Sequence, residues 1–275
     1  LFFLVLNIGT LAVNGTVNDL AMCGAKPLYL SCGMVLEEGL SVETLRQIVA
    51  SMREMADAAG VAIVTGDTKV VERGAADKLF INTAGIGVIP SGVNISATRA
   101  QVGDKIIING YLGDHGCAIL LARNELALET DIQTDCQPLH DLVKKMLEIC
   151  PDIHCLRDAT RGGVGTVLNE FATSSEVGIR INETALPMRE TVKGACEILG
   201  LDPLYLANEG KLLAIVPPDF ADELISAMQA HPAGKEASII GEVIESPKGI
   251  VMMNTGFGGG RIVDLLVGEQ LPRIC

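Results

Sequence analysis

The sequence predicts a mixed α/β protein of the α+β type, built as two successive halves. Short β-branched runs alternate with segments that carry apolar residues at helical spacing, which is typical of strands and helices in one domain. The 30 glycines indicate many tight turns and close backbone approaches, which a helical bundle does not need. Because aromatic residues make up 3% of the chain and tryptophan is absent, Ala, Val, Ile, Leu and Met must form the core.

The first half begins with small and apolar residues at helical spacing, which predict a buried helix. Ser41 is a good N-cap and Gly60 a good helix stop, so the amphipathic stretch between them is predicted to be a second helix. The predicted elements are a helix over 8–21, a strand over 28–36, a helix over 42–60, a buried strand over 61–65 that stops at Gly66, and a strand over 79–89 broken by Gly85 and Gly87.

A stretch rich in Pro, Gly and Ser, residues 90–104, predicts a domain boundary. After it we expect strands over 105–109, 179–182, 212–216 and 239–244, and helices over 139–149, 166–173 and 221–230, with a further helix after the turn 112–116. The predicted organisation is a first domain over 1–98, a second over 99–266, and a tail over 267–275.

The composition narrows the class of partner and the compartment. A net charge of −13 repels a phosphate backbone, so we expect no nucleic-acid partner, although Mg²⁺ can still bridge carboxylates to a nucleotide. No run reaches transmembrane length, so we expect no membrane partner. The eight cysteines form no CxxC pairs, which indicates reduced thiols and a cytoplasmic protein. The start lacks Met and the features of a signal peptide, so we expect the chain to begin inside a longer protein.

Acidic residues beside Gly or Thr mark candidate nucleotide-metal loops. Asp19 lies near the end of the first helix, Gly66-Asp67-Thr68-Lys69 follows a strand, and Asp158 opens a glycine-rich loop before a helix. Carboxylates suit Mg²⁺, and glycines let backbone N–H groups approach phosphate oxygens. Each aspartate alone is more often a cap or turn residue, and spacing does not establish that the loops converge.

Two further residues could take part in chemistry. Glu209 precedes a strand and is either a solvated turn residue or a carboxylate poised for proton transfer. Cys275 is the last residue, and the tail from Gly268 could span about 25 Å, so its thiol could reach a distant pocket. Composition alone leaves open that this terminal cysteine is accidental.

Motifs along nearly the whole chain resemble the HypE family of hydrogenase maturation proteins, within the PurM-like (AIR synthase-related) superfamily. They are Tyr29–Gly33, Leu36–Gly39, Val64–Val71, Lys78–Gly85, Leu156–Val164, Ala207–Lys211 and Pro272–Cys275. The resemblance implies a PurM-like two-domain fold in which the N-terminal sheet domain forms a homodimer. It also implies ATP and Mg²⁺ as cofactors in the cleft between the domains.

The resemblance further implies the activity. A HypF-like carbamoyltransferase would place a carbamoyl group on the thiol of Cys275. The chain would then use ATP to dehydrate this S-carboxamide to S-cyanocysteine. The cyanide would pass to iron on a HypC–HypD-like scaffold for [NiFe]-hydrogenase.

Site residues follow by matching the family's motifs. Asp19 and Asp158 are expected at the metal, with Asp19 also at the nucleotide beside Gly66, Asp67 and Thr68. Glu209 or Lys69 is expected to assist proton removal, and Cys275 to carry the substrate. The family has a glycine-rich N-terminal stretch with another metal-binding aspartate, and this sequence starts downstream of both. We therefore expect this chain alone to bind ATP weakly or not at all, and the full-length protein to bind it.

Two other functions remain open at this point. One is a different PurM-like ATP-using synthetase, such as a selenophosphate synthetase, although the reactive N-terminal cysteine or selenocysteine of that enzyme is absent. The other is a non-catalytic maturation scaffold that recruits partners through its tail, which would tolerate loss of Cys275.

Overall fold

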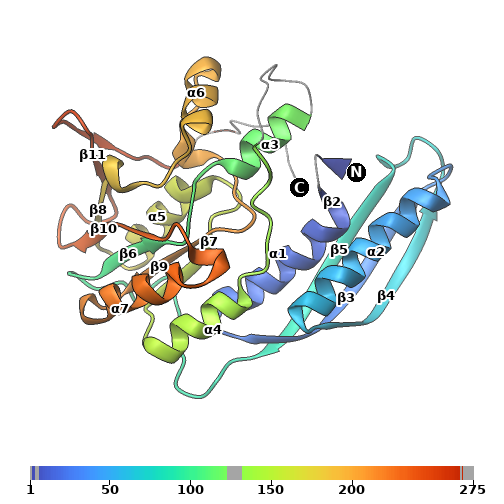
Figure 1. The fold of residues 1–275 in the computed structure, drawn as a ribbon, viewed down its shortest axis with the longest axis horizontal. Helices are drawn as coiled ribbons and strands as arrows, with labels where there is room; N and C mark the ends of the chain where they lie inside the picture. Colours follow the sequence, from blue (N-terminus) through green and yellow to red (C-terminus); the bar gives the residue numbers. More distant parts are fainter. Residues whose placement is uncertain (1, 4–5, 123–131, 267, 269–275) are drawn as a thin grey trace.

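The computed structural model describes residues 2–3, 6–122, 132–266 and 268. Its elements form two units, each organised around its own sheet, with helix α1 (Ile8–Met22) between them (Figure 1). The predicted α/β class is confirmed. A short antiparallel pair, β1 (Phe2–Phe3) with β2 (Leu6–Asn7), precedes α1.

The first unit is a three-stranded sheet covered on one face by two helices. The sheet order is β4 (Ala62–Val71), β3 (Lys26–Glu37), β5 (Leu79–Val88), with β4 parallel and β5 antiparallel to β3. Helices α1 and α2 (Val42–Ala59) pack on one face through a core that includes Val13, Val17, Leu30, Ile48 and Met52. The opposite face is uncovered, because Tyr29, Phe80 and Ile86 are 49%, 55% and 68% exposed.

Two predictions about these strands were wrong. The chain over 61–65 was expected to be a buried strand that stops at Gly66, but β4 continues to Val71 and is exposed along nearly its whole length. Parallel pairing with β3 from Tyr29 to Glu37 carries β4 through Gly66. Strand β5 likewise runs unbroken through Gly85 and Gly87.

The second unit is a seven-stranded sheet between two helical layers. Its strands are β6 (Lys105–Ile108), β7 (Cys155–Asp158), β8 (Gly178–Asn182), β9 (Leu212–Val216), β10 (Ser238–Ile244), β11 (Val251–Asn254) and β12 (Gly260–Ile262). Their order is β12-β11-β8-β10-β6-β9-β7. The helices are α3 (Asp114–Ala122), α4 (His140–Ile149), α5 (Gly163–Ser174), α6 (Glu190–Leu199) and α7 (Pro218–Gln229).

Alternation along the central strands explains why both faces are buried. On β6, Ile106 and Ile108 join a core with α5, whereas Ile107 joins a core with α4 and α7. Ala21 and Met22 from the end of α1 belong to this second core. Helix α1 therefore packs against both units and brings its last turn to the second sheet.

The observed helices and strands mostly agree with prediction. The predicted helices over 8–21, 42–60 and 139–149 are confirmed within one residue at each end. Helix α6 and the short strands β7, β11 and β12 were not predicted. Within the described part of the chain, no helix is both long and apolar enough to cross a bilayer.

Candidate active site

The loop Asn208–Lys211, just before β9, is held through its main chain by side chains from separate segments. Asn18 Nδ2 donates to the carbonyl oxygen of Glu209 at 3.3 Å, and the Glu209 amide donates to Asp135 Oδ1 at 3.0 Å. The carbonyl oxygen of Gly210 accepts from Asn109 Nδ2 at 3.1 Å and from Gln137 Nε2 at 3.2 Å. With so many main-chain groups satisfied, the loop presents Glu209 in a fixed position.

Glu209 is 6% exposed and lies among other carboxylates. Its burial, followed by the negative charges of Asp135, Asp158 and Asp19, raises its pKa to about 8, against the opposing effect of Arg161. A carboxylate with this pKa is a much stronger base than an ordinary glutamate. Such a group inside a carboxylate cluster is a candidate for proton transfer.

Two predicted metal residues lie within electrostatic reach of Glu209 and of each other. Asp19 is on the last turns of α1, and Asp158 ends strand β7. Partial burial and then the charge of Asp158 raise the pKa of Asp19, while Arg157 and Arg161 lower it. The packing of α1 against the second sheet therefore brings Asp19, Asp158 and Glu209 into one cluster from three distant parts of the sequence.

This cluster fits a cation held by few protein ligands. Among the residues that the structure describes, no three His, Cys, Asp or Glu side chains are arranged to hold a metal. Mg²⁺ usually takes one or two carboxylates and completes its shell with water and phosphate oxygens, so a pair of aspartates suffices. Burial and then the charge of Asp158 raise the pKa of Asp19, and a divalent cation would offset both effects.

Beside Asp158, the chain turns sharply into helix α5. Gly162 and Gly163 have φ of +73° and +60°, and a Cβ on Gly163 would lie 2.5 Å from the carbonyl oxygen of Leu204. Glycine is therefore required there by both conformation and space. The 12-residue helix α5 starts with no side-chain cap, which leaves N–H groups next to the carboxylate cluster and Arg161.

The remaining predicted residues of the first unit lie elsewhere. Strand β4 carries Gly66, Asp67, Thr68 and Lys69. It is one of the two edge strands of the first sheet and lies on the side of the first unit away from the second unit (Figure 1). Gly66, Asp67 and Thr68 line a groove of about 790 Å³ between β4 and α2. A Cβ on Gly66 would lie 2.0 Å from the carbonyl oxygen of Cys32, so close packing against β3 is sufficient to explain a glycine at this position. Cys275 lies outside the described residues.

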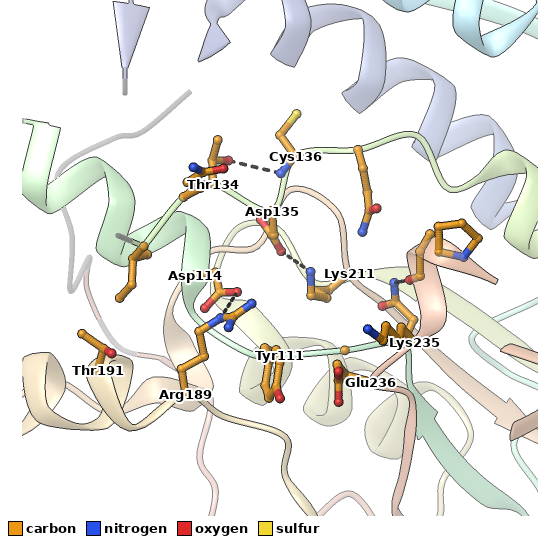
Figure 2. Close-up of a pocket in the computed structure, with 17 residues that line it drawn as sticks. Tyr111, Asp114, Thr134, Asp135, Cys136, Arg189, Thr191, Lys211, Lys235 and Glu236 are labelled. Carbon is orange, nitrogen blue, oxygen red and sulfur yellow. Dashed lines mark hydrogen bonds and ion pairs between the residues drawn. The ribbon is translucent and has the colours of Figure 1, made fainter. Parts of the chain in front are cut away.

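A polar cavity of about 770 Å³ lies next to the loop that carries Glu209 (Figure 2). Lys211 on its wall pairs with Asp135 at 2.9 Å, and Arg189 pairs with Asp114 at 3.0 Å while lying over the ring of Tyr111. Sequence reasoning missed Asp135, because no local motif marks it and only tertiary folding brings it to Glu209. Asp114 was predicted only as part of the turn over 112–116, and its place in the cavity wall was not predicted.

The chain matches known proteins along nearly its whole length. The family described as "AIR synthase related protein, N-terminal domain" matches residues 5–89, and "AIR synthase related protein, C-terminal domain" matches residues 101–254. Carbamoyl dehydratase HypE of Azotobacter vinelandii is 55% identical over 275 residues, which are 100% of this chain and 81% of that protein. The chain belongs to the HypE family. The resemblance proposed from the motifs is therefore confirmed.

Solved structures of the HypE family superpose on this chain closely. HypE in complex with ATP gives a TM-score of 0.95 at 50% identity, covering 100% of this chain and 83% of that one. HypE in a HypE–HypF complex gives 0.94 at 51% identity, covering 97% and 87%. These matches confirm the PurM-like fold.

Proposed function

We propose that this chain is an ATP-dependent carbamoyl dehydratase that converts an S-carboxamide on Cys275 to S-cyanocysteine. The product supplies the cyanide ligand of iron during [NiFe]-hydrogenase maturation. The observation that carries this function is the 55% identity to a carbamoyl dehydratase along the whole chain. The clustered carboxylates around Glu209 supply a site with suitable chemistry.

Dehydration of the amide removes one oxygen and two nitrogen-bound protons. ATP, when bound, supplies the phosphoryl group that lets the amide oxygen leave as phosphate. The residues must orient the amide, exclude water and accept the protons. Glu209 is the group we assign to proton acceptance, because it is buried, immobilised through its main chain and strongly basic for a carboxylate. Lys69 is the second candidate for assisting this step.

We assign Mg²⁺ to Asp19 and Asp158 and the phosphates to the start of α5. Two carboxylates whose charges act on each other suit a divalent cation, and the uncapped N–H groups beside Gly163 suit phosphate oxygens. Arg161 adds positive charge at the same place. Binding of Mn²⁺ as a spectroscopic substitute should weaken in Asp158→Asn, while Asp152→Asn, which changes an exposed aspartate elsewhere, should leave it unchanged.

A second copy of the chain completes the site in this proposal. The uncovered face of the first sheet carries Tyr29, Phe80 and Ile86, which is more exposed apolar surface than a monomer usually keeps. Strand register puts Asp67 beside Gly33 and Lys69 beside Val35, on this same face. Homodimerisation through the face would cover the apolar residues and place Gly66–Lys69 near a nucleotide bound by the partner copy.

The partners follow from the same family membership. A relative forms a HypE–HypF complex, and we propose a HypF-like carbamoyltransferase as the enzyme that loads Cys275. A HypC–HypD-like iron scaffold would accept the cyanide. We place the whole reaction in the cytoplasm, where the Cys275 thiol that receives the carbamoyl group stays reduced.

Intact-mass spectrometry tests the function directly. The chain is incubated with carbamoyl phosphate, ATP and the carbamoyltransferase, and the expected result is a carbamoyl adduct at Cys275 followed by loss of one water. Cys275→Ser should abolish both steps and leave the fold intact, with Cys23→Ser, which removes an exposed thiol at the end of α1, as control. Normal maturation by Cys275→Ser would favour the scaffold alternative, and a different ATP-dependent product would favour another PurM-like synthetase.

A further inference from the structure

Asp135 contacts the loop of Glu209 at two points. The two residues are 74 positions apart in the sequence, and folding brings the segment that contains Asp135 against the loop. The Asp135 side chain is 3% exposed, and its oxygens are engaged separately. Oδ1 accepts from the Glu209 amide at 3.0 Å, and Oδ2 accepts from Lys211 Nζ at 2.9 Å, the latter drawn as a dashed line in Figure 2.

We propose that Asp135 is the positioning residue for Glu209: by bridging the amide of Glu209 and the ammonium of Lys211, it fixes the main chain from which the Glu209 carboxylate projects. This inference rests on the proposed function, in which Glu209 accepts a proton from the substrate amide. Asp135 acts through Glu209 and not on the substrate amide itself.

Packing around Gly210 supports this assignment. Gly210 lies between the two groups that Asp135 holds, and a Cβ there would lie 1.9 Å from the carbonyl oxygen of Asp135. The main chain at Gly210 thus packs directly against the main chain at Asp135, and the loop cannot move closer to Asp135. Lys211 is 7% exposed, so its ammonium compensates a carboxylate that would otherwise be buried without a counter-charge.

The position of Asp135 also affects the charge environment of Glu209. The charged groups that act on Glu209 are Asp135, Asp158 and Asp19, which raise its pKa, and Arg161, which lowers it. Asp135 has the largest effect among these charges. Replacing Asp135 with a neutral residue therefore lowers the pKa of Glu209 and populates its carboxylate at lower pH.

The test is single-turnover dehydration by the full chain carbamoylated at Cys275, measured from pH 5.5 to about 9 in Asp135→Asn. Asparagine keeps an oxygen for the Glu209 amide but loses the charge and presents its NH₂ to Lys211. We expect the rate to fall about 100-fold, which is typical of a displaced catalytic group, with the KM for ATP unchanged. The acid limb of the pH–rate profile should move to lower pH.

The chain offers a matched control in Asp104. It is 3% exposed and also holds an amide and a basic side chain, accepting from Gln101 N and from His154 Nδ1, both at 2.7 Å, away from the loop. Asp104→Asn should lose stability but keep the rate and the pH profile. If Asp135→Asn fails to fold, Asp135→Asn/Lys211→Met removes both charges of the pair, and the same shift of the acid limb is expected.

The outcomes separate this inference from the proposed function. An active wild type in which Asp135→Asn, or the folded double variant, keeps the wild-type rate and profile overturns the role of Asp135 alone. A wild type that carries the carbamoyl group yet forms no nitrile in the presence of ATP overturns both.

Discussion

The side chain of Asn18 on helix α1 donates a hydrogen bond to the carbonyl oxygen of Glu209, across 191 positions of sequence. The same Nδ2 donates to the carbonyl oxygen of Gln137, and Oδ1 accepts from the amide of Leu139. Asn18 is 2% exposed, so water cannot reach these main-chain groups to replace its hydrogen bonds. One residue of helix α1 therefore ties together the loop that carries Glu209 and the segment that contains Gln137 and Leu139.

Asn18→Ala should weaken both the fold and the reaction. It leaves main-chain groups of Gln137, Leu139 and Glu209 buried without this partner, which costs about 2–3 kcal/mol of unfolding free energy. Urea denaturation followed by circular dichroism measures this loss. Asn94→Ala, at an exposed position, should change stability by less than about 0.5 kcal/mol. Equal effects of the two variants would contradict the role of Asn18.

Gly210→Ala should displace the loop that carries Glu209. The added methyl group would lie 1.9 Å from the carbonyl oxygen of Asp135, so the main chain of the loop must move. We expect this movement to lower the free energy of unfolding by about 1–3 kcal/mol and to reduce the dehydration rate strongly. Gly194→Ala is the control, since a Cβ in that part of α6 meets nothing within 4 Å. It should stabilise the helix by about 0.5–1 kcal/mol and leave the rate unchanged.

Glu209→Gln should make the stability of the chain less sensitive to pH. The pKa of Glu209 rises from 4.5 to about 8 on folding, so between these values the folded chain retains a proton that the unfolded chain releases. The stabilisation is complete below about pH 4.5 and is lost as pH rises toward 8, by about 1.4 kcal/mol per unit. Relative to wild type, Glu209→Gln should thus gain stability over this range in chelator-treated protein. A pH-independent difference between the two would contradict the assignment.

Ile86→Glu should convert the proposed homodimer to a monomer. Ile86 is 68% exposed on the uncovered face of the first sheet, and a carboxylate there would be buried without a partner in the dimer. Analytical ultracentrifugation measures the mass. Ile198→Glu is the matched control, because Ile198 is 66% exposed on α6 of the other unit and should leave the dimer intact. Dimers of Ile86→Glu at micromolar concentration would contradict this interface.

Local patterns were sufficient for the α/β class, the buried helix α1 and the loop that carries Glu209. They also marked Asp19, near the end of a predicted helix, and Asp158, at the start of a glycine-rich loop, although the metal role predicted for both came from the resemblance to the HypE family. They missed Asp135, whose proximity to Glu209 depends on the packing of segments far apart in sequence. They misjudged β4 because its continuation past Gly66 depends on pairing with β3, and a glycine that accommodates a neighbouring main chain resembles a strand end.

The contacts that immobilise Glu209 use its amide and carbonyl groups. The architecture of this loop is thus largely independent of the side chain at that position. Mutation can exchange the group that we propose accepts the proton, for example Glu209→His or Glu209→Asp, while the supporting hydrogen bonds stay in place. New proton-transfer chemistry could therefore be engineered, or could evolve, at position 209 without redesign of the scaffold that surrounds it.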